Sequence, residues 1–175
     1  MIGAGAIESF ERIFFSAARG RLTNGSSCEI STREKPDTSR GVEAVVLTIS
    51  SVKFRLLLLL HYRDDDATRA FYTGSTPQRS LREAFLEVAN LCCGAVNQAL
   101  VEHFPDLGMS TPYRLNGASA GHLAELKPDY LAAYDLTVGG SVWLSATLCV
   151  CANAPVDFVA DVRDVDEGVG ELEMF

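Results

Sequence analysis

Apolar residues recur at helical spacing over residues 80–104, where the chain has its most regular pattern of hydrophobic and polar positions. At about 100° per residue, the apolar positions form one continuous stripe along one side of a helix. These positions are Phe85, Val88, Ala89, Cys92, Val96 and Ala99. Ser80 and Glu83 have the S-x-x-E spacing of a capping box, and Pro105 supplies a stop. The pattern predicts one long helix whose stripe packs against the core.

The opposite side of this helix is polar and has an unusual composition. It carries Glu83, Glu87, Asn90, Gly94 and Asn97. Asn is a mediocre helix former, and Gly costs about 1 kcal/mol relative to Ala in a helix interior. A surface selected only for stability and solubility would carry Glu, Lys, Gln and Ala. The composition therefore favours a functional surface, although helix geometry alone is also compatible with an ordinary solvated face.

The remainder of the chain predicts a second helix and a sheet. Ile7, Phe10, Ile13 and Phe14 recur at helical spacing, which predicts a helix over residues 5–19. Strands are predicted over residues 42–52, 53–62, 108–115, 134–138, 142–151 and 156–162, with a break at Pro112 and a hairpin turn at Gly139-Gly140. Their order and short connections predict an α+β fold, a mostly antiparallel sheet with two main helices packed on it.

A single domain over residues 1–175 is predicted, because a chain of 175 residues suits one core and no linker divides it. Residues 20–41 are polar and rich in Ser, Thr and Gly, which predicts a long exposed loop with a short strand near residues 28–32. Residues 164–175 are rich in Asp and Glu, which predicts a solvated acidic tail. We expect no function in the 20–41 loop.

The almost continuous apolar run over residues 54–60 is typical of a strand that is covered on both faces. One cover is expected to be a helix. A partner subunit is expected to supply the other.

Charge and composition exclude several classes of protein. The net charge of −8 argues against a nucleic-acid binder, for which a basic stripe is expected. Glu8 and Glu11 interrupt the apolar amino-terminal region, unlike a secretory signal peptide. The longest apolar run, residues 56–60, is too short to span a bilayer. Five cysteines without a C-x-x-C pair are typical of the reduced cytoplasm, where Cys packs as a small apolar side chain. We expect a cytoplasmic protein without membrane insertion.

Other chemical motifs are weaker. Residues 117–121 match G-x-S-x-G, the nucleophile elbow of α/β-hydrolases. The alternating parallel strand and helix pattern of those enzymes is missing, and the only His after Ser119 is the near neighbour His122. A flexible loop of small residues is the better interpretation. The scattered His residues and the acidic run from Asp64 to Asp66 predict no metal site, and a helix cap or solvated turn explains the acidic run.

Glu87 and Asn90 remain as the strongest candidates for chemistry. At positions i and i+3 of a helix, their side chains are neighbours and can meet one target. An amide can hold a water by donating and accepting at once, and a carboxylate beside it can pair with a cation of a partner. The polar face carries no Lys or Arg, no phosphate cradle and no metal ligand set. We therefore expect the substrate to bring most of the electrostatic machinery.

These residues resemble a known family. Glu87 to Ala95, EVANLCCGA, is similar to the E-x-x-N-x-x-x-G signature of the CheC/CheX/FliY group, especially the CheX-like chemotaxis phosphatases. Residues 109–112 with Gly117 are similar to the strand, Pro and Gly that follow this helix in the family. Upstream, residues 66–71 and Gly74 also resemble its layout. The resemblance covers about residues 40–163.

The resemblance implies a phosphatase that removes the aspartyl phosphate from a phosphorylated CheY-type response regulator. Asn90 would orient the attacking water, and Glu87 would form a salt bridge with a lysine of the regulator. Glu83, Gly94 and Asn97 would contact the partner. The chain would need no cofactor of its own, since Mg²⁺ is expected in the acidic pocket of the regulator.

The resemblance also raises two further expectations. CheC-type proteins carry two E-x-x-N motifs, whereas no second Asn of this chain follows an acid at that spacing, so one site per chain is expected. A homodimer paired through sheet edges is expected, and the apolar strand over residues 54–60 would suit it. The alternative function is a non-catalytic module of the same fold that binds a response regulator or a flagellar-switch component.

Overall fold

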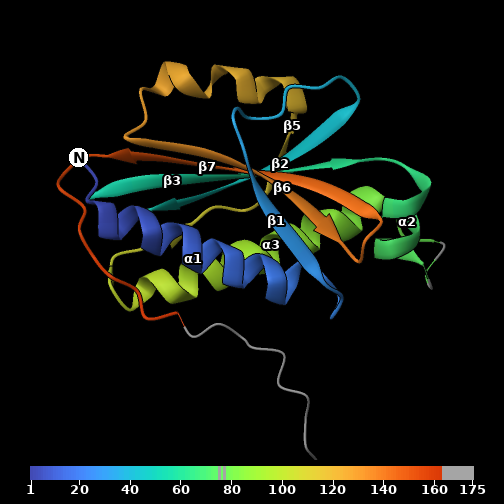
Figure 1. Cartoon of the computed structure of the whole chain (residues 1–175), viewed down its shortest axis with the longest axis horizontal. Helices are drawn as coiled ribbons and strands as arrows, with labels where there is room; N and C mark the ends of the chain where they lie inside the picture. The colour runs from blue at the N-terminus through green and yellow to red at the C-terminus, as the bar shows by residue number, and fades with distance from the viewer. Residues whose placement is uncertain (75, 77, 163–175) are drawn as a thin grey trace, which may run out of the picture.

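The computed structural model describes residues 1–74, 76 and 78–162, and it contains one seven-stranded sheet (Figure 1). The strand order is β1-β6-β7-β3-β2-β4, and β5 also pairs with β2. All paired strands are antiparallel. The bounds are β1 Cys28–Arg33, β2 Val42–Ser50, β3 Phe54–Arg63, β4 Gly108–Met109, β5 Tyr113–Asn116, β6 Tyr130–Val138 and β7 Val142–Ala152. The α+β prediction with a mostly antiparallel sheet is confirmed.

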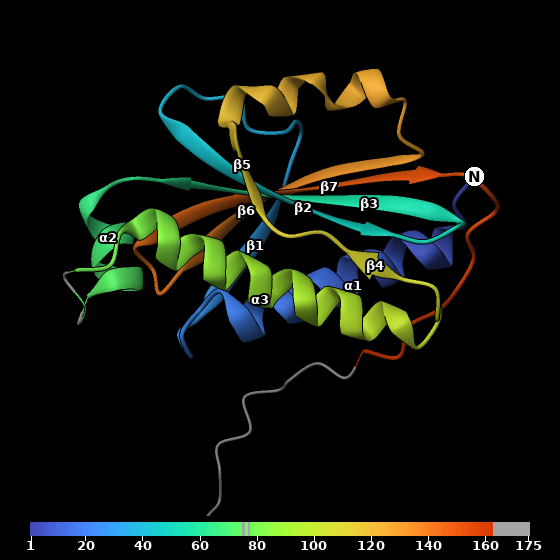
Figure 2. The same cartoon turned by 180° about the vertical axis from the view of Figure 1, so that it is seen from behind.

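Helices cover both faces of this sheet. The two long helices, α1 (Ala4–Arg21) and α3 (Leu81–Val101), lie side by side on one face, and α2 (Asp66–Thr73) lies beyond one end of α3 (Figures 1 and 2). A 3₁₀ helix, η1 (Gly117–Leu126), lies on the opposite face. The two main helices were predicted, but η1 was not. Its sequence of small residues has no helical periodicity by which it could be recognised.

Strand β3 lies in the middle of the sheet, between β7 and β2. Its side chains at Leu56, Leu58 and Leu60 belong to the core beneath α1 and α3. On the other face, Leu59 packs in a smaller cluster with Leu123 of η1. The strand is therefore covered on both faces as predicted, but this chain's own η1 supplies the second cover over Leu59. A partner subunit was the wrong expectation there.

The position of β3 also corrects the expected route to a homodimer. An interior strand has both of its hydrogen-bonding edges occupied, so it cannot pair with a second chain. In the described part of the chain, β1 is one outer strand of the sheet, and β4 and β5 form the other edge. The homodimer stays a prediction, and β1 is the longer outer strand available for it.

The β6–β7 hairpin follows the predicted turn. Gly139 and Gly140 have φ angles of +58° and +73°, the left-handed conformations that a tight hairpin turn requires. Strand β6 begins at Tyr130, four residues before its predicted start at residue 134. The predicted strand over residues 156–162 is wrong, because only Val156 forms an isolated parallel bridge, with Ile2. The predicted acidic tail, residues 164–175, lies outside the described residues.

The break at Pro112 separates two short strands on the edge of β2. β4 pairs with the end of β2 and β5 with its start. Between them, the Ser110 hydroxyl accepts a hydrogen bond from the Thr48 N–H at 2.9 Å, and the Ser110 N–H donates to the Thr48 carbonyl at 2.8 Å. Because proline lacks an N–H, this edge cannot be continuous there, and Ser110 holds the interrupted segment against β2.

Candidate functional site

A complete capping box fixes the start of α3. The Ser80 hydroxyl accepts a hydrogen bond from the Glu83 N–H at 3.2 Å, and the Ser80 N–H donates to the Glu83 carboxylate at 3.4 Å. The predicted cap is therefore confirmed. It gives the Glu83 carboxylate a local structural role, in addition to the partner contact that we expect of it.

The apolar stripe holds α3 on the sheet. Phe85, Ala89, Cys92 and Val96 are fully buried, and the Phe85 ring lies 4.2 Å from the ring of Tyr62 on β3. Val88 and Ala99, which were predicted in the same stripe, are only partly buried. Burial raises the pKa of the Cys92 and Cys93 thiols, so both stay protonated at neutral pH and act as core side chains.

This stripe also explains why α3 alone, among the helices that the structure describes, is long and apolar enough to cross a bilayer by length and composition. A core helix of a folded domain meets the same criteria. α3 buries one side against the sheet and carries Arg82, Glu83 and Glu87 near its start.

Asn90 and Glu87 lie together on the outward side of α3. Asn90 is partly buried, and the Glu87 side chain is 57% exposed. Within the described part of the chain, no hydrogen bond occupies the Asn90 amide, so both its donor and its acceptor are free. The pair therefore presents a carboxylate and an unoccupied amide to the same region of solvent, as their i, i+3 spacing predicts.

A cation that sequence reasoning missed lies beside this pair. The Arg79 guanidinium contacts the Glu87 carboxylate. Arg79 precedes the Ser80 cap, so it comes from the connection between α2 and α3 rather than from the helix itself. The helix face itself carries no Lys or Arg, as the sequence indicated, but a cation from the preceding connection reaches it. Arg79 is eight positions before Glu87 in the sequence, which is outside the i, i+4 spacing by which helical ion pairs are recognised.

Gly94 lies one turn beyond Asn90 on the same side of α3. A Cβ atom built on Gly94 meets nothing within 4 Å. Packing within the described chain therefore does not require glycine here, although glycine costs helix stability. Leu91, on the same outward side, is 49% exposed. A bare patch of backbone and an exposed Leu thus flank Glu87 and Asn90.

Asn97 lies two turns after Asn90 on α3. Its Oδ1 atom is buried and makes no hydrogen bond within the described residues. The side chain is otherwise partly exposed. Of the five predicted site residues, Glu83 is engaged in the cap, and Glu87, Asn90, Gly94 and Asn97 form one continuous surface along the helix.

A fixed cluster of charges lies next to this surface, on β2 and β5. The Glu43 carboxylate accepts a hydrogen bond from the Tyr62 hydroxyl at 2.9 Å and pairs with Arg114 at 3.1 Å and with Arg82 at 3.6 Å. Burial, reinforced by the Glu43 carboxylate, raises the pKa of Tyr62. These contacts tie the first turn of α3 to the sheet edge and balance Arg82 locally.

The chain is similar to known proteins in its structure, whereas no sequence comparison gives a match. No protein-family model and no curated protein sequence matches the chain. Among solved structures, CheX from Vibrio vulnificus is 14% identical with a TM-score of 0.58, over 81% of this chain and 98% of that chain. A CheX-CheY-BeF3-Mg complex from Borrelia burgdorferi is 13% identical with a TM-score of 0.58, over 83% and 97%. The FliM middle domain from Vibrio alginolyticus is 11% identical with a TM-score of 0.53, over 81% and 91%.

The chain has the CheX/CheC-like fold. The predicted resemblance is therefore confirmed at the level of the fold. At identities of 14% and below, the likeness shows the fold alone.

The other candidate motifs have structural explanations. In the CheX/CheC-like fold of this chain, the G-x-S-x-G residues begin η1, where a Cβ atom on Gly117 would lie 2.4 Å from the Val42 carbonyl oxygen. His122 Nδ1 lies 2.8 Å from Glu125 on the surface. Asp65 caps α2 by accepting from the Thr68 N–H at 2.9 Å, which lowers the pKa of Asp65. No cluster of three metal-ligating residues occurs in the described ranges.

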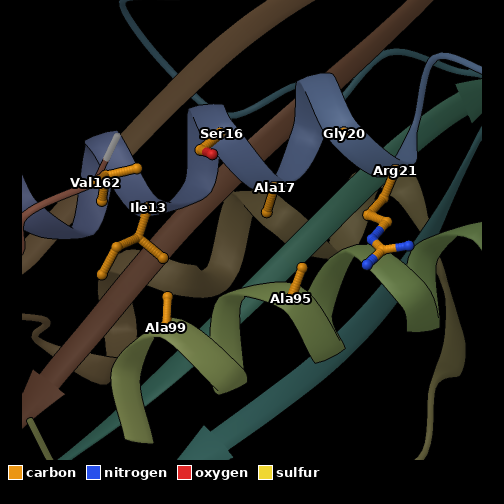
Figure 3. Close-up of a pocket in the computed structure, with 8 residues that line it drawn as sticks. All are labelled: Ile13, Ser16, Ala17, Gly20, Arg21, Ala95, Ala99 and Val162. Carbon is orange, nitrogen blue, oxygen red and sulfur yellow. The ribbon is translucent and has the colours of Figure 1, made fainter. Parts of the chain in front are cut away.

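Two cavities lie away from Glu87 and Asn90. One, of about 330 Å³, lies between α1 and α3, where small side chains leave space between the two helices (Figure 3). Its lining includes Ser16, Ala17, Gly20 and Arg21 of α1 and Ala95 and Ala99 of α3. The other, of about 510 Å³, lies on the opposite face of the sheet, between residues 32–38, η1 and the start of β6. The predicted exposed loop, residues 20–41, thus contains β1 and lines a cavity.

Proposed function

We infer that this chain is a phosphatase that hydrolyses the aspartyl phosphate of a CheY-type response regulator in the cytoplasm. One observation carries the inference. Glu87 and Asn90 stand side by side on the outward face of α3, the Asn90 amide has no hydrogen bond to any described residue, and the backbone at Gly94 is open. The CheX/CheC-like fold supports it, because one structure with this fold is a complex of CheX with CheY, BeF3 and Mg.

Asn90 is the residue that acts on water. Its amide oxygen accepts a hydrogen bond from one water O–H, and its amide N–H donates to the water oxygen, so that the remaining lone pair points at phosphorus. The water oxygen then forms a bond to phosphorus as the bond from phosphorus to the aspartyl oxygen breaks. Inorganic phosphate leaves, and the carboxylate of the regulator is restored. Catalysis of such a reaction depends on positioning the water and on stabilising the charge of the phosphoryl group.

Glu87 holds the regulator. Its exposed carboxylate is suited to pair with an ammonium group of the partner, while Gly94 lets the partner approach the helix backbone closely. The magnesium ion belongs to the regulator, where it neutralises charge on the phosphoryl group when bound.

The test is the lifetime of the acyl phosphate on CheY-type regulators of the same organism, measured with and without the protein. We expect acceleration by the wild-type chain and a loss of about 10²-fold in Asn90→Ala, because misplacing the reacting water costs that much. Ser31→Ala, an exposed change on the outer strand β1, is the control and should keep full activity. Undiminished acceleration by Asn90→Ala would contradict the proposed role of Asn90.

The likeness to the FliM middle domain favours a second candidate. In it, the chain binds a regulator or a flagellar-switch component through the same face of α3 without catalysis. This candidate predicts that binding survives in Asn90→Ala and that the wild-type chain leaves the phosphate lifetime unchanged. The lifetime measurement therefore separates the two candidates.

A further inference from the structure

Glu87 already has a cationic partner within the chain. The Arg79 guanidinium contacts its carboxylate, with the Arg79 and Glu87 side chains 40% and 57% exposed. The backbone of Arg79 is held in place, since its N–H donates to the Thr76 carbonyl at 3.0 Å and Ser80 caps α3 immediately after it. A tethered side chain thus delivers a positive charge to the carboxylate that the regulator is proposed to use.

The environment of this ion pair distinguishes it from the other arginines near α3. Arg82 and Arg114 both pair with Glu43, which also accepts from the Tyr62 hydroxyl, so they belong to a network with several supports. Glu87 pairs only with Arg79 among the described residues. An exposed pair of this kind contributes little to stability, typically less than 1 kcal/mol. It can therefore open at little cost when another cation arrives.

We propose that Arg79 is a resident competitor for Glu87, which it holds in the free protein and releases to an ammonium group of the docking regulator. The proposal rests on the proposed function, since that function is what brings a cation to Glu87. Exchange makes docking selective. A regulator with a well-placed cation replaces Arg79, whereas a protein without one finds the carboxylate already neutralised and gains nothing from it.

The exchange has a measurable consequence. A regulator that must displace Arg79 binds more weakly than it would to an unoccupied carboxylate, by the strength of the resident pair. For an exposed pair this corresponds to about two- to fivefold in affinity. Because Arg79 acts through Glu87 and not on the reacting atoms, the effect belongs to binding: KM should change while kcat stays constant.

The experiment compares Arg79→Gln with Arg82→Gln. Both variants remove one positive charge near the start of α3, so they change long-range attraction equally, but only the first frees Glu87. The probe is a CheY-type regulator activated with BeF3⁻ and Mg²⁺, and its Kd is measured by titration calorimetry. We expect Arg79→Gln to bind two- to fivefold more tightly than Arg82→Gln, with lower KM and unchanged kcat, and Arg79→Lys to behave like the wild type.

A second comparison isolates the carboxylate. In a Glu87→Gln background, the gain from Arg79→Gln should disappear, because no charge is left to compete for. A gain that persists there, or Arg79→Gln binding no tighter than Arg82→Gln, overturns the exchange. Regulator binding that shows the exchange without any loss of acyl phosphate would support the exchange and overturn the phosphatase. A wild-type chain that binds no regulator overturns both.

Discussion

At the scale of single residues, the two main residues of the candidate site differ in whether they already have a partner in the free protein. The Asn90 amide is unoccupied within the described chain, whereas the Glu87 carboxylate is paired with Arg79. An amide gains little from a permanent partner if its task is to hold a water for one step. A carboxylate that pairs before docking, in contrast, sets a threshold that each approaching protein must exceed.

Gly94 makes a prediction at this scale, because nothing in the described chain requires a glycine there. Gly94→Ala should stabilise the protein by up to about 1 kcal/mol, the gain in helix propensity, which corresponds to about 2–4 °C in Tm. The added methyl group points into open space, where a docking regulator would meet it. We therefore expect higher stability and weaker regulator binding in the same variant.

Thermal unfolding and a binding titration of Gly94→Ala check the two effects separately. Gly20→Ala offers a matched comparison, because it is also a helical glycine whose added Cβ meets nothing within 4 Å, and it lies on α1. Gly20→Ala should stabilise without loss of binding. Unchanged binding by Gly94→Ala would show that the partner does not approach the backbone at this position.

At the scale of elements, the capping box determines how firmly the first turn of α3 holds the site. Ser80→Ala removes the acceptor of the Glu83 N–H, so we expect a loss of about 1 kcal/mol in the free energy of unfolding. Urea unfolding measures it. Ser141→Ala, in the exposed turn between β6 and β7, removes a hydroxyl without removing a cap and should change the unfolding midpoint little. Equal losses in the two variants would refute the stabilising role of the cap.

The sequence predicted those elements whose patterns are local. The stripe of α3 and its cap, the Gly139-Gly140 turn and the break at Pro112 are each set by neighbouring residues, and all are present. The failures came from contacts between distant residues. Residues after Val156 are apolar enough for a strand, but Phe158 stacks against Phe10 and Phe104 instead, and its ring lies 5.1 Å and 5.0 Å from theirs.

In the candidate site, too, the residues set by a local pattern were predicted and the residue set by a longer connection was not. The E-x-x-N spacing on one helix placed Glu87 and Asn90 together, because both side chains share the geometry of α3. Arg79 could not be placed from the sequence, because its position depends on the turn of the chain between α2 and α3. The backbone hydrogen bond from the Arg79 N–H to the Thr76 carbonyl belongs to that turn.

At the scale of the whole molecule, polar groups are buried beneath the second face of the sheet. His61 on β3 is fully buried, and both of its ring nitrogens lack a hydrogen-bond partner within the described residues. Ser145, its cross-strand neighbour on β7, is also buried, and its hydroxyl has no hydrogen-bond partner among the described residues. Burial lowers the pKa of His61, although the carboxylate of Asp37 opposes this change.

The lowered pKa makes folding stability depend on pH. The folded protein binds the His61 proton less tightly than the unfolded chain, whose His pKa is about 6.5. The stability is therefore fully present above that pH and falls as the pH decreases through it. We expect the urea midpoint to decrease between pH 7.5 and pH 5.5 in the wild type and to decrease less in His61→Gln. An equal decrease in both proteins would contradict the role of His61.

The interruption of the sheet edge at Pro112 has a consequence for assembly. An edge made of the two short strands β4 and β5 offers no continuous ladder to another chain, whereas β1 is a single strand of six residues at the far end of the sheet. α3 packs over the β2 side, so strand addition at β1 would leave the two copies of Asn90 at opposite outer ends of the assembly. Such a dimer would bind two regulators at the same time without a steric clash between them, one regulator per chain.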